Sequence, residues 1–267
     1  MSMQEVRTTW RKKRKIENPL IRYGILVLVL AYLYLAGTGV EVNADRVSRG
    51  LSRVGLLFSG FFQPDFQSRG KYIVEGILES VAMTLASSAF AMILAVPIAL
   101  GASRNIVPKW VYLICRVFLM LIRSLHVVIL GIIFVIMFGY GPLAGVLTLM
   151  VNGVGFIGKL LAEDIENIQE EQLEAIRATG ASWLKTVVYA VWPQVSTRFI
   201  GLSIYRADIS FRQSTVIGIV GAGGIGAVLD TAMGRYDYHT AGAILLVIII
   251  MVLVTEYGSS AIRRRIV

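Results

Sequence analysis

Cysteine, histidine and acidic residues are scarce in this chain, and each scarcity excludes a class of protein. The single cysteine, Cys115, lies in an apolar run, which rules out an intrachain disulfide and favours a role as a small hydrophobe. The two histidines, His126 and His239, stand far apart in the sequence and form no metal-type cluster with cysteine. No nucleophile–base pair stands out either, so the residues give no support for an enzyme or a metal site.

Charge is also sparse. Charged residues make up 16% of the 267 residues and hydrophobic residues 56%, with a mean hydropathy of +0.70. That balance is typical of an integral membrane protein. A net charge of +9 would suggest nucleic acid in a soluble protein, but much of it lies in the runs 11–15 and 263–265 near the two ends. The membrane surface explains such runs better, so we expect a lipid bilayer and no nucleic acid as a partner.

Long apolar runs predict six membrane spans, because about 20 residues of helix cross the hydrocarbon core. The expected spans are residues 21–40, 76–101, 111–138 and 143–161, a fifth that begins at Pro193, and 240–257. By the positive-inside rule, both basic termini are expected in the cytoplasm of a bacterial cell, on the same side as the polar segment 163–193. The predicted fold is therefore an all-α, polytopic inner-membrane bundle.

Two parts are expected. Residues 1–75 form a basic segment, the first span and a periplasmic segment, and residues 76–267 form the transmembrane domain. In the periplasmic segment Arg46, Arg49 and Arg53 recur at helical spacing opposite apolar residues. That spacing favours an amphipathic helix on the membrane surface, although a solvated loop fits equally well.

Segment 163–193 is a polar island between apolar blocks, with six acidic residues in its first half. So much charge cannot stay in hydrocarbon, which predicts a structured loop outside the bilayer. Gly180 fits a helix stop, Ser182 the N-cap of a new helix, and Pro193 the start of the next membrane element. Two short helices of this kind suit the docking of another protein.

The same segment resembles the EAA loop of ABC-importer permeases. The matching positions are Glu174, Ala175, Gly180 and Pro193, and the departures from the consensus are Ile176, Ala190 and Trp192. The resemblance implies the type I permease fold, with cytoplasmic coupling helices that dock into a groove of a separate ATPase subunit. The coupling residues that it implies are Glu174, Ala175, Arg177, Gly180 and Ala181. An ordinary acidic loop is the alternative.

Other stretches resemble the phosphonate-type ABC permeases in particular. They are RQSTVIGIVGAGGIG at 212–226, FGYGPLAGVL at 138–147 and FFQPDF at 61–66, and the likeness covers about residues 60–267. It implies import of phosphonate, phosphite or a small relative by a homodimer of this chain. Two ATPase subunits would bind inside, carrying ATP and Mg²⁺, and a solute-binding protein outside, while this chain carries no cofactor.

Three alternatives stay open. A permease for another small solute is one, because methionine-type permeases share the VGAGGIG-like element at 220–226. A gradient-driven transporter or channel is another, and a membrane-embedded enzyme is the third.

Two glycine-rich motifs resemble nucleotide-binding motifs, but neither is expected to bind a nucleotide. Residues 221–226 match G-x-G-x-x-G without the βαβ context, and 153–159 resemble a P-loop until Leu160 replaces the required Ser or Thr. The glycines at 221–226 are instead expected to pack helices closely or to break one.

Five ionisable residues inside the expected spans are candidates for the substrate pathway: Arg123, His126, Arg206, Asp208 and Arg212. Asp208 and Arg212 are four residues apart and are expected to pair, which leaves Arg206 without a local partner and facing a dimer-axis cavity. Arg123 and His126 are expected one turn apart on one helix face. The positive excess suits an anion, whereas the alternative is that these groups only tie helices together.

Overall fold

The computed structural model describes residues 19–39 and 44–266, and every element within those ranges is helical, as the sequence predicts. Contacts divide the chain into two compact units, residues 1–55 and 56–267. The boundary predicted at 75/76 stays a prediction. The first unit contains α1 (Pro19–Gly39), an apolar helix long enough to cross a membrane.

Helix α2 (Ala44–Phe62) begins in the first unit and ends in the second, so the solvated-loop alternative for this segment is wrong. Asp45 lies in its first turn, where a carboxylate favours the helix dipole, and the Nε of Arg49 donates to the Asp45 carbonyl at 3.0 Å. Val47, Leu51 and Val54 are exposed apolar residues at helical spacing. The helix is amphipathic as predicted, and its place on a membrane surface stays a prediction.

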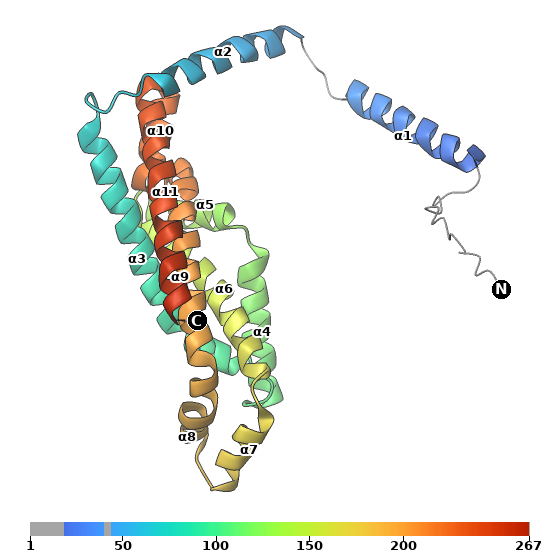
Figure 1. Ribbon diagram of the computed structural model, residues 1–267, viewed down its shortest axis with the longest axis vertical. Coiled ribbons are helices and arrows are strands. Elements are labelled where there is room, and N and C mark those ends of the chain that lie inside the picture. Colours follow the sequence, from blue (N-terminus) through green and yellow to red (C-terminus); the bar gives the residue numbers. More distant parts are fainter. Residues whose placement is uncertain (1–18, 40–43, 267) are drawn as a thin grey trace, which may run out of the picture. The chain divides into compact units, whose positions relative to one another are not determined.

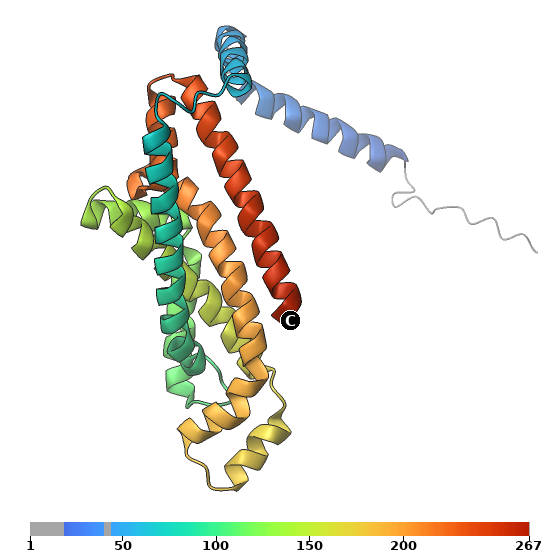
Figure 2. The same cartoon turned by 60° about the vertical axis from the view of Figure 1, so that its left-hand side comes forward.

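The second unit is a bundle whose long helices run roughly along one axis (Figures 1 and 2). Its elements are α3 (Gly70–Gly101), α4 (Lys109–Ser124), α5 (Val127–Phe138), α6 (Pro142–Glu166), α7 (Glu170–Ala178), α8 (Trp183–Thr186), a π-helical turn at Val187–Val191, α9 (Trp192–Ile217), a second π-helical turn at Gly218–Ala222, α10 (Gly224–Gly234) and α11 (Tyr238–Ile266). Helices α7 and α8 extend beyond the long helices at one end, which we call the α7–α8 end.

The described helices give the predicted six spans only when bent helices are counted as single spans. Four helices, α1, α3, α6 and α11, are long and apolar enough to cross a membrane alone. Two further pairs qualify together, α4 with α5 across a 92° bend and the α8–α9 run with α10 across a 55° bend. The third predicted span is therefore not one straight helix. Leu125 adopts an extended backbone, and the imidazole Nδ1 of His126 accepts the Val128 N–H at 3.3 Å, so the helix restarts in a new direction.

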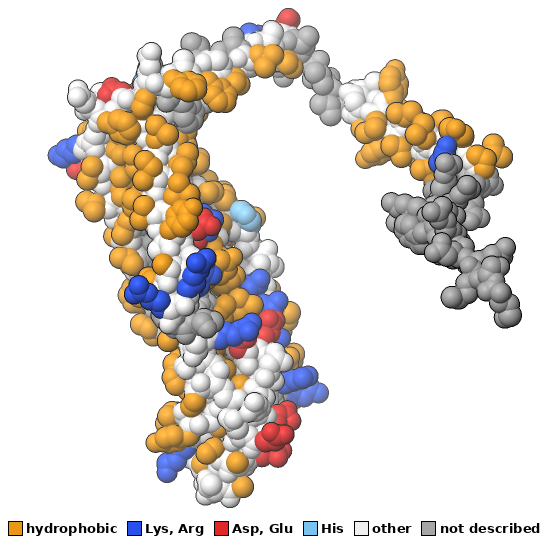
Figure 3. All heavy atoms as spheres, viewed as in Figure 1, with side chains coloured by type: hydrophobic (Ala, Val, Ile, Leu, Met, Phe, Trp, Pro, Cys, Tyr) orange, Lys and Arg blue, Asp and Glu red, His pale blue; other side chains and the backbone are white. Residues whose placement is uncertain are grey.

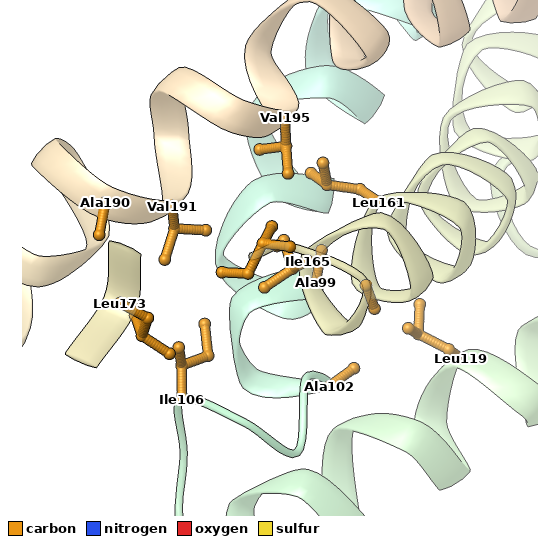
Figure 4. Close-up of a cluster of buried hydrophobic side chains, with 12 residues drawn as sticks. Ala99, Ala102, Ile106, Leu119, Leu161, Ile165, Leu173, Ala190, Val191 and Val195 are labelled. Carbon is orange, nitrogen blue, oxygen red and sulfur yellow. The ribbon is translucent and has the colours of Figure 1, made fainter. Parts of the chain in front are cut away.

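Apolar residues of the polar segment are buried with those of the long helices. Leu173 of α7 and Val191 of the π-helical turn belong to one buried cluster with Ile165 of α6, Ala99 of α3 and Leu119 of α4 (Figure 4). Removing a large apolar side chain of this kind from water stabilises a fold by about 2 kcal/mol. The α7–α8 end is thus continuous with the core of the bundle.

Helix α6 approaches its neighbours through glycines. A Cβ at Gly153 would lie 2.7 Å from the Cβ of Ala91 on α3, and one at Gly158 would lie 2.9 Å from a methyl group of Leu119 on α4. Real Cβ atoms do not come this close to a neighbour, so a side chain at either position would force the neighbouring group to move. The small residues therefore bring three helix backbones close together.

Glycines also break the helix between α9 and α10, as predicted. Gly221, Gly223 and Gly224 have φ values of +94°, +82° and +71°, a region that L side chains rarely adopt. The freed N-terminus of α10 is held by α3: Glu79 accepts the Gly224 N–H at 2.9 Å, and the Ser80 hydroxyl accepts the Ile225 N–H at 2.9 Å. Since these groups satisfy the first amides of α10, the contact with α3 stabilises the break in the helix.

Candidate functional site

A short loop between α3 and α4 holds together the helices of the α7–α8 end. The Asn105 amide donates to the Ile165 carbonyl at 2.8 Å, near the end of α6. The Arg177 guanidinium donates to the Asn105 carbonyl at 3.0 Å, and the Trp183 indole donates to the Ile106 carbonyl at 2.9 Å. Helices α6, α7 and α8 are therefore all tied to one loop by hydrogen bonds.

The acidic residues of this end fall into two groups. Those on α6 are paired: Arg116 lies 4.0 Å from Glu163 and 3.8 Å from Glu166, and the Nε of Arg198 lies 2.8 Å from Asp164. Those on α7, namely Glu170, Glu171 and Glu174, are exposed. Charged side chains gather toward this end of the bundle in Figure 3, whereas apolar side chains cover much of the remaining length. The exposed end is the polar surface that the sequence predicts for docking.

The predicted coupling residues lie on α7 and in the turn that follows it. Glu174, Ala175, Arg177 and Gly180 are exposed, and Ala181 is half-buried. Gly180 has φ +76°, and a Cβ built there would meet nothing within 4 Å. Its backbone conformation, rather than crowding, requires glycine. The contact of these residues with an ATPase stays a prediction.

The end of the polar segment differs in detail from its prediction. Ser182 occupies the N-cap position of α8 as expected, but its side chain makes no capping hydrogen bond. Pro193 lies in the first turn of α9, yet the helix already runs into it from α8 through the π-helical turn at Val187–Val191. The prediction that Pro193 lies at the start of the next membrane helix is therefore confirmed to within one residue, although no break separates α9 from the π-helical turn before it.

Arg206 is enclosed by the chain's own helices. Its side chain is 2% exposed, and its Nη2 donates to the Leu149 carbonyl of α6 at 3.3 Å and to the Gln213 side chain at 3.1 Å. The prediction that Arg206 lacks a local partner is wrong, since an i+7 amide and a carbonyl of another helix both reach it. Its Nε has no hydrogen-bond partner among the described residues. In this conformation the side chain lies between α6 and α9.

Phe156 of α6 brings Arg206 and Arg123 to the same place. The Cζ of Arg206 lies 5.7 Å from the centre of the Phe156 ring, and that of Arg123, from α4, lies 5.9 Å from it. Both distances allow cation–π attraction. Among the described residues, neither arginine makes an ion pair with a carboxylate, and Arg123 is exposed. We call Arg123, Phe156 and Arg206 the arginine–phenylalanine cluster, and its uncompensated positive charge suits an anion.

Sequence reasoning missed Phe156, because one aromatic residue in an apolar helix carries no pattern of its own. The available signal was its place three residues after Gly153 in a helix that faces two arginine-bearing spans.

The remaining pathway candidates lie apart from this cluster. Asp208 and Arg212 form the predicted ion pair within α9, with side chains 3% and 43% exposed. His126 is exposed and caps α5. Because α4 and α5 are bent by 92° between Arg123 and His126, the prediction that those two share one helix face is wrong. Whether any of the five contacts substrate stays a prediction. No group of three metal-ligating side chains occurs among the residues that the structure describes.

Known proteins resemble this chain in sequence over most of its length. It is 36% identical to a phosphite transport system permease protein of Stutzerimonas stutzeri over 252 residues, which are 94% of this chain and 89% of that protein. It is 34% identical to a phosphate-import permease protein of Mycolicibacterium smegmatis over 96% of this chain and 48% of that longer protein.

Solved structures share the fold. The structure of the MetNI methionine ABC transporter in inward-facing conformations aligns with a TM-score of 0.65 at 22% identity, over 75% of this chain and all of that one. An amino acid ABC transporter solved with histidines aligns with a TM-score of 0.61 at 18% identity, over 75% of this chain and 98% of that one. At these identities the likeness speaks to the fold alone, and it is that of ABC-importer permeases, as predicted.

A family description covers the larger part of the bundle. Residues 91–266 match the family described as binding-protein-dependent transport system inner membrane component. The match takes in the arginine–phenylalanine cluster and the whole segment from α6 to α9. The chain belongs to the family of binding-protein-dependent transport system inner membrane components.

Proposed function

We propose that this chain is the membrane-spanning permease of an ATP-driven importer for a small phosphorus oxyanion such as phosphite, a phosphonate or phosphate. The observation that carries the proposal is the identity of 36% over 94% of the chain to a permease named for phosphite. The arginine–phenylalanine cluster agrees with it, because a permease for an anion needs positive charge within its membrane-spanning part. The chain itself breaks no bond.

The proposed assembly contains two copies of this chain, two ATPase subunits that bind ATP and Mg²⁺, and one solute-binding protein. The α7–α8 end would face the cytoplasm, together with both termini. Its exposed α7 residues would sit on the ATPase, and the hydrogen bonds of Arg177 and Trp183 to the loop after α3 would carry the movement to α6. The solute-binding protein would dock at the opposite end of the bundle.

Within the membrane, Arg123 and Arg206 would act at different depths in the path. Arg123 is exposed and is the charge that an anion meets, while Arg206 lies behind the Phe156 ring and adds its field without leaving its partners. A buried charge acts strongly through a surrounding of low dielectric constant. Arg212 and Asp208 neutralise each other and would contribute less.

The test is uptake by proteoliposomes that contain the transporter. The chain is co-expressed with its ATPase and binding protein, and the complex is then reconstituted. We expect ATP-dependent accumulation of labelled phosphite, competition by phosphonate or phosphate, and no competition by methionine. Methionine uptake, or accumulation that follows an ion gradient without ATP, would overturn the proposal.

A further inference from the structure

A basic cavity lies between α9 and the last turns of α11, beside the α7–α8 end. Its volume is about 750 Å³, and its lining residues are Gln194, Thr197, Arg198, Gly201, Leu202, Tyr205, Ser260, Arg263 and Arg264. Among these described residues three are arginines and none is acidic. The polar residues come from the start of α9 and the end of α11, whereas Gly201 and Leu202 form an apolar wall deeper along α9.

One of the three arginines makes an ion pair among the described residues. The Nε of Arg198 lies 2.8 Å from Asp164, which is outside the cavity. Arg263 is held at the wall with its Cζ 5.3 Å from the centre of the Tyr205 ring and its Nε donating to the Ser259 carbonyl at 3.4 Å. Arg264 is exposed. Three cations face one neighbouring carboxylate, so an anion would improve the electrostatics of the cavity.

We propose that this cavity binds the phosphate-bearing head group of an anionic phospholipid. Three observations favour a lipid over a free oxyanion. The cavity lies at the end of two membrane-spanning helices, where head groups are found. Its lining combines arginines with Leu202 and the ring of Tyr205, which suits a charged head group joined to an apolar chain. Its volume lies in the range that holds a drug-sized molecule rather than a four-oxygen anion. The site is separate from the arginine–phenylalanine cluster and does not depend on the transported solute.

The experiment measures lipid binding by the purified full-length transporter in detergent, by native mass spectrometry and by thermal stability. The probes are phosphatidylglycerol, phosphatidylcholine and inorganic phosphate. We expect phosphatidylglycerol alone to bind and to raise the melting temperature. Equal effects of phosphatidylcholine would show that charge plays no part, and an equal effect of inorganic phosphate would show a free-oxyanion site. Either result overturns the proposal.

Substitutions within the basic run 263–265 distinguish a specific binding site from general attraction to a positively charged surface. Arg264→Gln should weaken phosphatidylglycerol binding about fivefold, the factor that one cation near an anionic surface contributes. Arg265→Gln is the matched control, because Arg265 is the next residue, carries the same charge, is exposed and does not line the cavity. Equal losses in the two variants would overturn the proposal.

Two more substitutions test whether a loss of binding comes from the altered charge or from misfolding of the variant. Arg264→Lys keeps the charge and should retain most of the binding, while Ser260→Glu places a carboxylate among the arginines and should abolish it. Unchanged binding by Ser260→Glu would also overturn the proposal.

Discussion

The charged residues of the α7–α8 end and Arg206 in the middle of the bundle have opposite kinds of partner. At the α7–α8 end, Arg116 lies against two carboxylates and Arg198 against a third. In the middle, Arg206 is 2% exposed and has only a carbonyl, an amide and an aromatic ring as partners. Burying an uncompensated cation costs free energy that simple packing would avoid. The difference teaches that ion pairing accounts for the charges at the α7–α8 end, whereas no carboxylate among the described residues compensates Arg206. A role of Arg206 in transport, as proposed above, would explain why this cost is tolerated.

The strongest test of this contrast is Arg206→Ala. We expect the charge of Arg206 to stabilise the anion in transit by about 1.5–3 kcal/mol, the magnitude typical of an interaction with a charged group, so its loss should slow uptake roughly ten- to a hundredfold while the chain still reaches the membrane. Uptake is measured at equal amounts of membrane-inserted protein, together with basal ATP hydrolysis, which should persist. Arg206→Lys keeps the charge, and its uptake should lie between that of the unaltered protein and that of Arg206→Ala. Normal uptake by Arg206→Ala would end the distinction between the two regions.

The next largest effect is expected at Gly180, in the α7–α8 end. Gly180→Ala forces a side chain into a left-handed conformation at a cost of about 1–2 kcal/mol, although nothing crowds it. We expect uptake and transport-stimulated ATP hydrolysis to fall together, because the turn after α7 changes shape. Gly180→Asn should be milder, since asparagine tolerates this conformation. If both variants behave as the unaltered protein does, the turn has no part in coupling.

The Asp208–Arg212 ion pair of α9 predicts which of two substitutions destabilises the permease more. Arg212→Gln leaves the Asp208 carboxylate buried without its partner, whereas Asp208→Asn leaves Arg212 partly in contact with solvent. The first should lower the free energy of unfolding by about 1–3 kcal/mol and the second by less. Thermal melting of the purified permease checks the order. The double substitution should recover part of the loss, and a double variant worse than Arg212→Gln would contradict the assignment.

The smallest effect is expected from Arg116→Gln, the counterpart of Arg206→Ala at the α7–α8 end. Its two ion pairs are 4.0 and 3.8 Å long and partly exposed, which limits their contribution to about 1 kcal/mol or less. We expect near-normal uptake and a small drop in melting temperature that shrinks further in high salt. A loss of uptake as large as that of Arg206→Ala would erase the contrast.

Much of the α7–α8 end could be predicted from the sequence, because its signals are local. Gly180 marks a helix end by its own conformational freedom, and a run of acidic residues cannot stay in hydrocarbon. The Asp208–Arg212 pair was predictable for the same reason, since helical spacing alone brings the two side chains together.

The middle of the bundle could not be predicted in the same way. The bend between α4 and α5 occurs where Arg123, Ser124 and His126 interrupt the apolar run, but neither proline nor glycine marks it, and polar residues alone do not show that a helix turns. Besides Gln213 of its own helix, Arg206 has partners in Leu149 and Phe156 on another helix, which only tertiary packing reveals. The capping of α10 by Glu79 depends likewise on a contact between residues 145 positions apart.

The glycines of α6 restrict how such a permease can move. Because Ala91 of α3 packs against Gly153 and Leu119 of α4 packs against Gly158, sliding α6 by one residue would bring larger side chains against both contacts. We therefore expect α3, α4 and α6 to travel as a single rigid body. Any hinge has to lie elsewhere in the bundle, and the left-handed glycines at 221–224 are the joint with the backbone freedom to serve as one.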